Sequence, residues 1–416
     1  MLINENKSID LFDLIVIGGG AAGFFGAIAA AEKKAGLRIL ILEKTPKLLS
    51  KVKVSGGGRC NVTHHCLDPL KLSRHYPRGQ KELKQLFRTF QAADTISWFA
   101  DNGVKLKVEE DGRMFPVTDH SQTIIDCFIA KANQLDIEVR VNTGVERVDL
   151  IKEGFQIQCS NEETFYGKKI LIATGGHSQM RGYEWIAALG HTIKPLIPSL
   201  FTFNDSQKSF SDLMGVAIPN AFIKIAGTKF SETGPLLITH WGLSGPAVIK
   251  LSAWAAEYLF QANYTFTVLV SWIGEMAEDE LRSFLTNYKQ ESGKQKVIGN
   301  PLFSLPQRLW QRLSALAEIE ESKIWAELPL KNINKLIEFL IRCPFYIKGK
   351  TTFKEEFVTC GGVDLTEVHL ESMESKKVRN LFFAGEVLNI DGETGGFNFQ
   401  SAWTTAWVAA QQISHN

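Results

Sequence analysis

Two glycine-rich stretches, far apart in the chain, have the residue types that bind phosphate groups. The first, Gly18-Gly19-Gly20-Ala21-Ala22-Gly23, is a G-x-G-x-x-G motif between an expected strand at 12–17 and an expected helix at 21–35. In this motif the first glycine makes the turn, the second admits a pyrophosphate to the backbone, and the third lets helix and strand pack closely. The N–H groups and dipole of the helix start then favour an anion.

Glu43 completes this first unit. It ends the apolar stretch "LRILILE" at 37–43, which predicts a second buried strand and therefore a β-α-β unit in a parallel sheet. The spacing suits a carboxylate that accepts hydrogen bonds from ribose hydroxyls. The unit predicts a bound dinucleotide, but alone it does not separate NAD from FAD.

The second stretch lies near the C-terminus. The buried strand "LFFAGE" at 381–386 is followed by "GETGGFNFQSAW" at 392–403, which leads into a helix expected at 399–413. Ligands of parallel sheets bind at the carboxyl ends of the strands, so both glycine turns are expected at one edge. An elongated ligand that touches both turns, with Glu386 as a second acid for a polyol, favours a flavin dinucleotide.

The stretch "SGGGRCNVT" at 55–63 holds three consecutive glycines, which cannot pack a core. We interpret it as backbone that passes against the cofactor, with Arg59 neutralising phosphate charge. Cys60 is interpreted as a small buried residue rather than a redox thiol, because no partner cysteine lies at oxidoreductase spacing.

The remaining pattern predicts two domains. Helices are expected at 81–102 and 124–135, with a hairpin around Asp111-Gly112 between them. After His191 the chain gains prolines, half-exposed antiparallel strands and, from Met276 to about Arg342, helical patterns. We predict an α/β, Rossmann-like nucleotide-binding domain formed by 1–194 and 346–416, interrupted by an insert domain at 195–345.

Composition restricts the function further. The 416 residues include 46 basic and 45 acidic ones, a net charge of +1, which argues against a general nucleic-acid or membrane-surface binder. The six cysteines form no C-x-x-C pair, so no metal site is predicted and the chain is interpreted as cytoplasmic. Residues 14–31 lack charge, but their clustered glycines argue against a membrane helix, and the N-terminus does not resemble a signal peptide.

These motifs together resemble one family. The segments "IGGGAAG", "SGGGRCNVT", "RMFPVTD", "THWGLSGPA", "GGVDL" and "LFFAGEVLNIDGETGGFNFQSAW" occur in order over nearly the whole chain. They are similar to those of the BaiN/RdsA-type NAD(P)/FAD-dependent oxidoreductases, also called YhiN-like or aminoacetone oxidase-like flavoproteins. The resemblance implies a two-dinucleotide-binding-domain flavoprotein fold whose FAD domain is interrupted by an antiparallel β-barrel with helices.

The resemblance also implies roles for individual residues. Gly18, Gly20, Ala22 and Gly23 would hold the FAD pyrophosphate, and Glu43 the adenosine ribose. Arg59, Cys60 and Asn61 would line the cofactor, Val145, Thr174 and Gly175 would surround the adenine, and Glu386 would face the ribityl phosphate. Gly396, Phe397 and Asn398 would contact the isoalloxazine edge. The neighbours Lys44, Ser55, Gly56 and Gly385 complete the expected cofactor-binding set.

Two features of the chain bear on which residue roles the resemblance implies. Many relatives carry a longer proline- and glycine-rich loop after "ATGG", whereas this chain has only "HSQMRGYEW" at 177–185. Contacts of that loop with substrate or pyridine nucleotide are therefore not carried over. In the insert, His240 is the only candidate for a catalytic proton donor, although a role in ordering its turn is the preferred interpretation. His177 and His191 are interpreted as structural or exposed.

The function expected is hydride transfer through FAD, with NADH or NADPH as co-substrate and a small conjugated ketone as acceptor. An oxidase of aminoacetone or a similar amine is the first alternative. A flavin-dependent RNA-modifying protein is a further one, supported only by the local patch of Arg74, Arg78, Lys81 and Lys84. A flavin-binding regulatory module is the last. The balanced charge predicts no nucleic-acid partner, no membrane partner is expected, and the pattern leaves the oligomeric state open.

Overall fold

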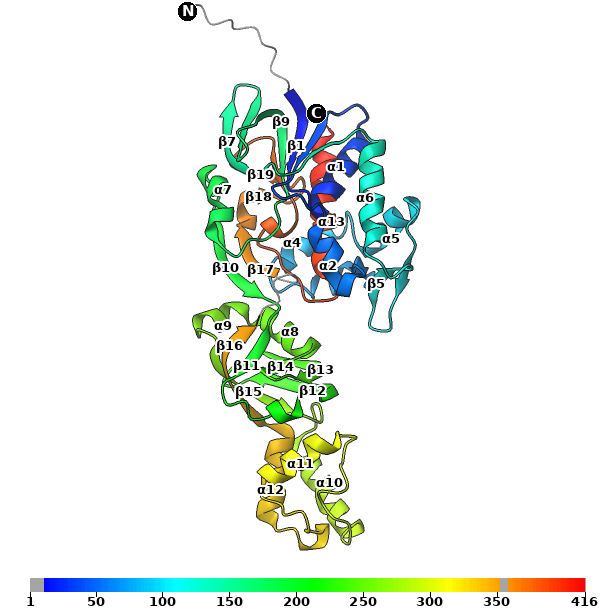
Figure 1. Cartoon of the computed structure of the whole chain (residues 1–416), viewed down its shortest axis with the longest axis vertical. Coiled ribbons are helices and arrows are strands. Elements are labelled where there is room, and N and C mark those ends of the chain that lie inside the picture. The colour runs from blue at the N-terminus through cyan, green and yellow to red at the C-terminus, as the bar shows by residue number, and fades with distance from the viewer. Residues whose placement is uncertain (1–10, 352–357, 416) are drawn as a thin grey trace, which may run out of the picture. The chain divides into compact units, whose positions relative to one another are not determined.

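The computed structural model describes residues 11–351 and 358–415. Contacts between Cα atoms divide the chain into two units, Met1–Ser199 with Lys354–Asn416, and Leu200–Phe353 (Figure 1). The first unit contains the glycine motifs and is the α/β, Rossmann-like unit that the sequence predicts.

A parallel sheet forms the centre of the first unit. Strand β1 (Leu11–Ile17) lies between β2 (Ile39–Leu42) and β9 (Thr164–Ile172), and all three run in the same direction. Strand β6 (Glu138–Arg140) extends the sheet beyond β2, and β20 (Leu381–Phe383) extends it beyond β9, again in parallel. Strands β1 and β2 are almost wholly buried, as expected for strands covered on both faces.

The register of this sheet aligns the carboxyl ends of four strands. Ile17 at the end of β1 pairs with Leu42 and with Ile172, and Ile172 pairs with Phe383. The residues that follow these four positions therefore lie at one edge of the sheet. That edge is where open α/β sheets bind their ligands.

Short antiparallel strands extend the sheet and flank it. Strands β7 (Val145–Ile151) and β8 (Gly154–Cys159) form a hairpin on β9, and β18 (Val368–His369) and β19 (Glu374–Ser375) continue beyond β20. Separate small sheets contain β3 (Thr63–His64), β4 (Leu106–Val108) and β5 (Arg113–Pro116), and β10 (Ile193–Ser199) with β17 (Val358–Val363). The hairpin expected around Asp111-Gly112 is confirmed as β4 and β5.

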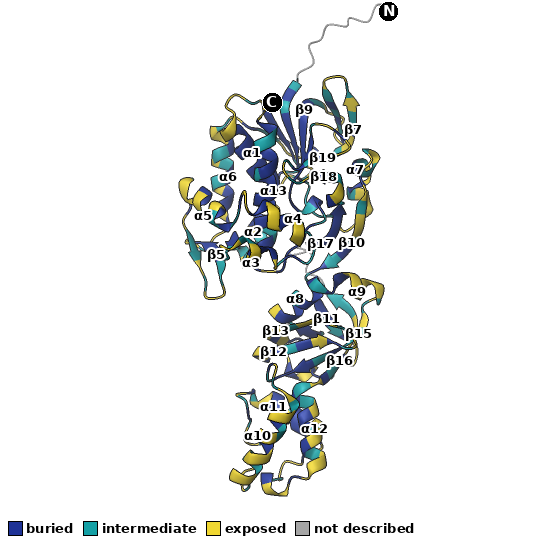
Figure 2. Ribbon diagram, turned by 180° about the vertical axis from the view of Figure 1, so that it is seen from behind, coloured by how far each residue is buried: buried dark blue, intermediate teal, exposed yellow. Residues whose placement is uncertain are grey.

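Helices α1 (Ala21–Lys33) and α13 (Phe397–Ile413) pack against each other, although they come from opposite ends of the chain. Their side chains meet α6 (Gln122–Gln134) in an aromatic cluster in which Phe25, Phe128 and Trp403 are fully buried. Figure 2 shows α1 and α13 mostly in the colour of buried residues. The cluster places the ring of Phe25 5.4 Å from that of Trp403. The two helices that follow the glycine turns are thus fixed to each other by apolar burial.

The single helix expected at 81–102 is wrong. The chain forms α3 (Pro69–Ser73), α4 (Gln80–Leu86) and α5 (Ala92–Asp101) in this region. A capping box begins α5, because the backbone N–H of Gln91 donates to the Asp94 carboxylate at 2.7 Å. Such a box satisfies the free donors of a new helix start, which separates α5 from α4.

The second unit is a closed barrel with helices inserted between its strands, and the family resemblance implies such a barrel with helices. The barrel consists of β11 (Thr202–Asp205), β14 (Gly242–Ser244), β13 (Ser231–Ile238), β12 (Ala217–Ile225), β15 (Thr265–Ser271) and β16 (Cys343–Thr351). The helices are α8 (Pro246–Trp254), α9 (Ala256–Gln261), α10 (Glu278–Glu291), α11 (Gln307–Leu316) and α12 (Leu330–Ile341). None of the helices over 11–351 and 358–415 is long and apolar enough to cross a membrane.

The third glycine of the first motif gives a test of the fold. A Cβ atom at Gly23 would lie 1.9 Å from the carbonyl oxygen of Gly18, which is backbone and cannot turn away. We expect Gly23→Ala to lower the free energy of unfolding by about 2 kcal/mol, since the strand and helix must separate. Urea denaturation measures this. An unchanged free energy of unfolding would contradict the close packing described here.

Candidate functional site

A pocket opens at the aligned strand ends of the first unit. It holds about 560 Å³ of empty space, part of it open to solvent. The residues that line it are Ile17, Gly18, Leu42, Glu43, Lys44, Thr143, Gly144, Val145, Thr174, His177, Arg181, Gly182 and Trp185. Five residues of the expected cofactor-binding set, from four separate segments, are thereby brought to one place: Gly18, Glu43, Lys44, Val145 and Thr174.

Glu43 fixes the floor of this pocket. One carboxylate oxygen accepts a hydrogen bond from the N–H of Gly19 at 2.9 Å, and the other accepts from the N–H and the hydroxyl of Thr45, both at 2.9 Å. The carboxylate therefore ties the end of β2 to the glycine turn after β1. The oxygen that accepts from Gly19 has further acceptor capacity for a ribose hydroxyl.

The start of α1 is open to a ligand. Gly20 is its N-cap residue and supplies no side-chain cap to the free N–H groups of the first turn. A Cβ atom built on Gly20 would meet nothing within 4 Å. Uncapped N–H groups beside open space form a cradle for a phosphate group.

Two buried hydroxyls near the strand ends have no hydrogen-bond partner within the part of the chain that the structure describes: those of Thr174 and Thr359. Thr174 lines the pocket, and the N–H of Thr359 donates to the Glu386 carboxylate at 2.9 Å. Glu386 also accepts from the Lys51 ammonium at 2.6 Å. Buried polar groups are normally hydrogen-bonded, so these hydroxyls fit a polar ligand such as FAD.

The three consecutive glycines have two environments. They fall within α2 (Ser50–Gly58), where Ser55 is extended and Gly56 and Gly57 adopt left-handed backbone with φ of 58° and 68°. A Cβ at Gly56 would lie 2.8 Å from the ring of Phe115, whereas Gly57 and Gly58 border open space. A packed aromatic ring thus requires the first glycine, and the other two leave backbone accessible.

Arg59 has carboxylate partners of its own. Its guanidinium contacts Glu109 at 2.8 Å and Asp119 at 3.5 Å, and it lies 3.9 Å from the centre of the Phe115 ring. These contacts balance its charge and order the segment around the glycines. Neutralisation of a phosphate by Arg59 stays a prediction.

Cys60 is completely buried, and burial raises the pKa of its thiol to about 12. It is therefore a protonated thiol at neutral pH, consistent with a packing role. The next residue, Asn61, joins the 55–63 stretch to the second glycine turn. The Asn61 side chain donates to the Thr63 carbonyl and accepts from the Gly396 N–H, both at 3.0 Å, in the orientation that satisfies both groups.

The second glycine turn begins α13 and is held by further contacts. The Asn398 side chain accepts from the Gly392 N–H at 2.9 Å and donates to the Gly392 carbonyl at 3.0 Å. The Tyr76 hydroxyl donates to the Phe397 carbonyl at 2.7 Å. Gly396, Phe397 and Asn398 are therefore rigidly placed in the first unit; their contact with an isoalloxazine stays a prediction.

Sequence reasoning missed the loop after Gly175. His177, Arg181 and Trp185 come from the short segment 177–185 and line the pocket. The position of the loop could have indicated its place at the pocket, because the loop follows the carboxyl end of β9. Burial, reinforced by the positive charges of Lys44 and Lys51, lowers the pKa of His177 to about 4.

Sequence reasoning also missed an acid–imidazole pair beside the second turn. His75 Nδ1 lies 2.9 Å from a carboxylate oxygen of Glu393, which is almost fully buried. The His75 ring stacks on Phe397 with 4.2 Å between ring centres. No local pattern signals this pair, because its members lie 318 positions apart.

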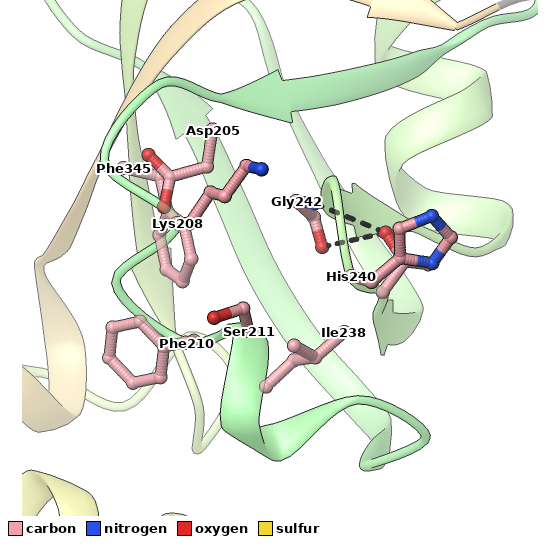
Figure 3. A pocket seen from close by; sticks show the side chains of 9 residues that line it. Asp205, Lys208, Phe210, Ser211, Ile238, His240, Gly242 and Phe345 are labelled. Carbon is pink, nitrogen blue, oxygen red and sulfur yellow. Dashed lines mark hydrogen bonds between the residues drawn. The ribbon is translucent and has the colours of Figure 1, made fainter.

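His240, the catalytic candidate of the sequence, belongs to the second unit. It is exposed and lines a small pocket together with Asp205, Phe210 and Phe345 (Figure 3). Beside it, the Thr239 hydroxyl donates to the Gly242 carbonyl and accepts from the Gly242 N–H. These bonds order the turn before α8. A catalytic role for His240 stays a prediction.

Comparisons with known proteins extend this description. The family model "HI0933-like protein Rossmann domain" matches residues 12–412. The chain is 30% identical over 414 residues to "Ribosomal RNA dihydrouridine synthase" of Escherichia coli, covering 97% of this chain and 98% of that protein. It is 26% identical to "3-dehydro-bile acid delta(4,6)-reductase" of Clostridium scindens, covering 95% and 97%.

Among solved structures, 3-ketosteroid-Δ4-(5α)-dehydrogenase from Rhodococcus jostii has a TM-score of 0.54 at 12% identity, covering 99% of both chains. At this identity the likeness concerns the fold alone.

The open space at Gly20 and the Thr174 hydroxyl give a paired test of the pocket. Thr174→Val removes a hydroxyl without a partner, so we expect unchanged stability of the flavin-free protein but about fivefold weaker FAD binding. Gly20→Ala is expected to lower stability by no more than about 1 kcal/mol and to weaken FAD binding by tenfold or more. Titration with FAD measures both. Wild-type affinity in both variants would show that the ligand binds elsewhere.

His177 predicts a dependence of stability on pH. Its pKa in the folded protein lies below the ordinary value of 6.5, so between pH 6.5 and about 4 the unfolded chain binds a proton that the folded chain does not. Stability is therefore lost as the pH falls through this window. We expect His177→Gln to lose less free energy of unfolding than wild type between pH 7 and pH 5, in denaturation experiments on the flavin-free protein. Equal losses would contradict a partly buried neutral imidazole.

Proposed function

The chain belongs to the HI0933-like family, and we propose that it is an FAD-dependent oxidoreductase that reduces a carbon–carbon double bond conjugated to a carbonyl group. The observation that carries the proposal is that the helices after the two glycine turns, α1 and α13, pack against each other, and that a Cβ at Gly385, just after β20, would lie 2.9 Å from the Cβ of Ala22 in the first motif. This arrangement suits a single elongated cofactor, as the motifs indicate.

The proposed reaction class rests on the names of two relatives. A ribosomal RNA dihydrouridine synthase and a 3-dehydro-bile acid reductase act on different molecules. Both reactions concern the same type of bond, a carbon–carbon double bond conjugated to a carbonyl group. In uracil it is the 5,6 double bond, and in a conjugated 3-oxo steroid it is a ring double bond; each is polarised by the carbonyl. One site chemistry therefore accounts for both relatives.

Uridine in ribosomal RNA is the substrate we propose first. The relative with that name is 30% identical over almost the full length of both chains. This preference differs from the sequence-based expectation of a small organic substrate. A conjugated small ketone is the second candidate, favoured by the Clostridium relative.

The chain's own residues have distinct tasks in this proposal. Gly18, Gly20 and the first N–H groups of α1 would hold the pyrophosphate, and Glu43 and Thr174 would hold the adenosine part. FAD, when bound, would supply hydride transfer between NADH or NADPH and the substrate carbon. The residues 396–398 would orient the ring system.

Addition of hydride to one carbon of a conjugated double bond leaves the neighbouring carbon to be protonated. His75 is the group that we propose for this step. Its Nδ1 faces Glu393, which fixes the ring orientation and leaves Nε2 to carry the proton. Its stacking on Phe397 places it beside the turn expected to hold the isoalloxazine.

Two measurements test the proposed reaction. Under anaerobic conditions, NADH or NADPH is expected to bleach the flavin of the purified protein, and ribosomal RNA is then expected to restore its colour while uridine gains two hydrogens, seen by mass spectrometry. Restoration by a conjugated 3-oxo steroid alone would favour the second candidate. Bleaching by aminoacetone, with no response to either nicotinamide, would overturn the reductase proposal in favour of an amine oxidase.

The proton donor gives a separate prediction. His75→Gln is expected to slow substrate reduction about 100-fold while flavin reduction by NAD(P)H stays unchanged, because only the second step needs the acid. Glu393→Gln is expected to give a smaller loss and a shifted pH profile. The exposed neighbour His65 provides the control variant His65→Gln, expected to behave like wild type. Full activity of His75→Gln would assign the proton to another group.

A further inference from the structure

A cationic surface covers the helices next to the second glycine turn. Its residues are Lys71, Arg74, Lys81, Lys84 and Arg88, all exposed. The same stretch, 68–88, holds only two carboxylates, Asp68 and Glu82. Because the whole chain has a net charge of only +1, this is a local excess of positive charge.

The spacing of these residues places them on common faces. Lys81, Lys84 and Arg88 recur every three to four positions along α4 and the turn that continues it, which is the period of one helical face. The opposite face holds Leu83 and Leu86, which are buried. Lys71 on α3 and Arg74 directly after its end are also three positions apart, and α3 packs against α4.

The two carboxylates of this stretch offset only part of its charge, since Asp68 interacts electrostatically with Lys71 and Arg74. Asp68 caps α3 by accepting from the N–H groups of Leu70 and Lys71 at 2.8 and 2.9 Å. Within the part of the chain that the structure describes, no ion pair is found for any of the five cations. Cations held on helices without a direct ion pair are suited to a polyanion.

Arg78, which the sequence assigned to this patch, has a different role. Its guanidinium pairs with the fully buried carboxylate of Asp391, which also accepts from the Ser199 hydroxyl at 3.0 Å. This pair, together with the contact of His75 with Glu393, anchors the α3–α4 turn to the loop that precedes α13. The cationic surface is thereby held at a fixed position relative to residues 396–398.

We propose that this surface, Lys71, Arg74, Lys81, Lys84 and Arg88, binds the phosphate backbone of the RNA substrate and presents a base to the site beside Phe397. The inference rests on the proposed function, which names RNA as substrate. It adds where the RNA is held: on α3 and α4, in the same unit as the cofactor motifs.

The test measures binding of a ribosomal RNA fragment to the FAD-loaded protein as a function of salt. In the variant Lys81→Gln/Lys84→Gln/Arg88→Gln, the slope of log affinity against log salt is expected to fall by about 2 to 3, because three phosphate contacts are lost. The control Lys33→Gln/Lys34→Gln/Lys152→Gln removes three exposed charges elsewhere in the first unit and is expected to keep the wild-type slope. Flavin reduction by NAD(P)H is expected to be unchanged in both.

The possible outcomes distinguish a failure of the proposed RNA-binding surface from a failure of the proposed function. A wild-type slope in the first variant, an equal loss in the control, or no RNA binding by the wild-type protein would overturn the surface. If the wild-type protein forms dihydrouridine and the first variant keeps its slope, the proposed function stands without this surface. If the wild-type protein forms none but the first variant loses binding, the surface stands and the proposed function fails.

Discussion

The register of the parallel sheet is the constraint on which the rest of the structure depends. Because Ile17, Leu42, Ile172 and Phe383 are aligned, the segments that follow four strands must meet at one edge. The alignment of the strand ends alone therefore brings these segments close enough to form one site. A slip of one residue in any strand would turn its side chains to the opposite face and separate these segments.

A second level of order comes from buried polar groups that join segments distant in sequence. Gln400, fully buried on α13, accepts from the hydroxyls of Thr63 at 2.6 Å and Thr95 at 2.9 Å. With the Asn61 and Asp391 contacts, it ties the middle of the first unit to the C-terminal helix. Such networks are costly when incomplete, so they specify one arrangement of these segments. In that arrangement the proposed cofactor turn, the imidazole of His75 and the cationic helices have fixed positions relative to one another.

Much of this architecture could be predicted from local pattern. The strand–glycine–helix order predicted the parallel sheet and α1. Contacts across the chain could not be predicted in this way. The pairing of Arg59 with Glu109 and that of His75 with Glu393 depend on tertiary packing. The Gln91 capping box was a local signal, yet the apolar spacing around it favoured one continuous helix.

The account stands on a single cofactor that spans both glycine turns. A crystal structure of the protein with bound FAD tests this most directly. We predict density for the pyrophosphate at the start of α1, the adenosine in the pocket of Glu43 and Thr174, and the isoalloxazine beside residues 396–398. Density for FAD that leaves either turn unoccupied, or a flavin bound at another place in the chain, would contradict it.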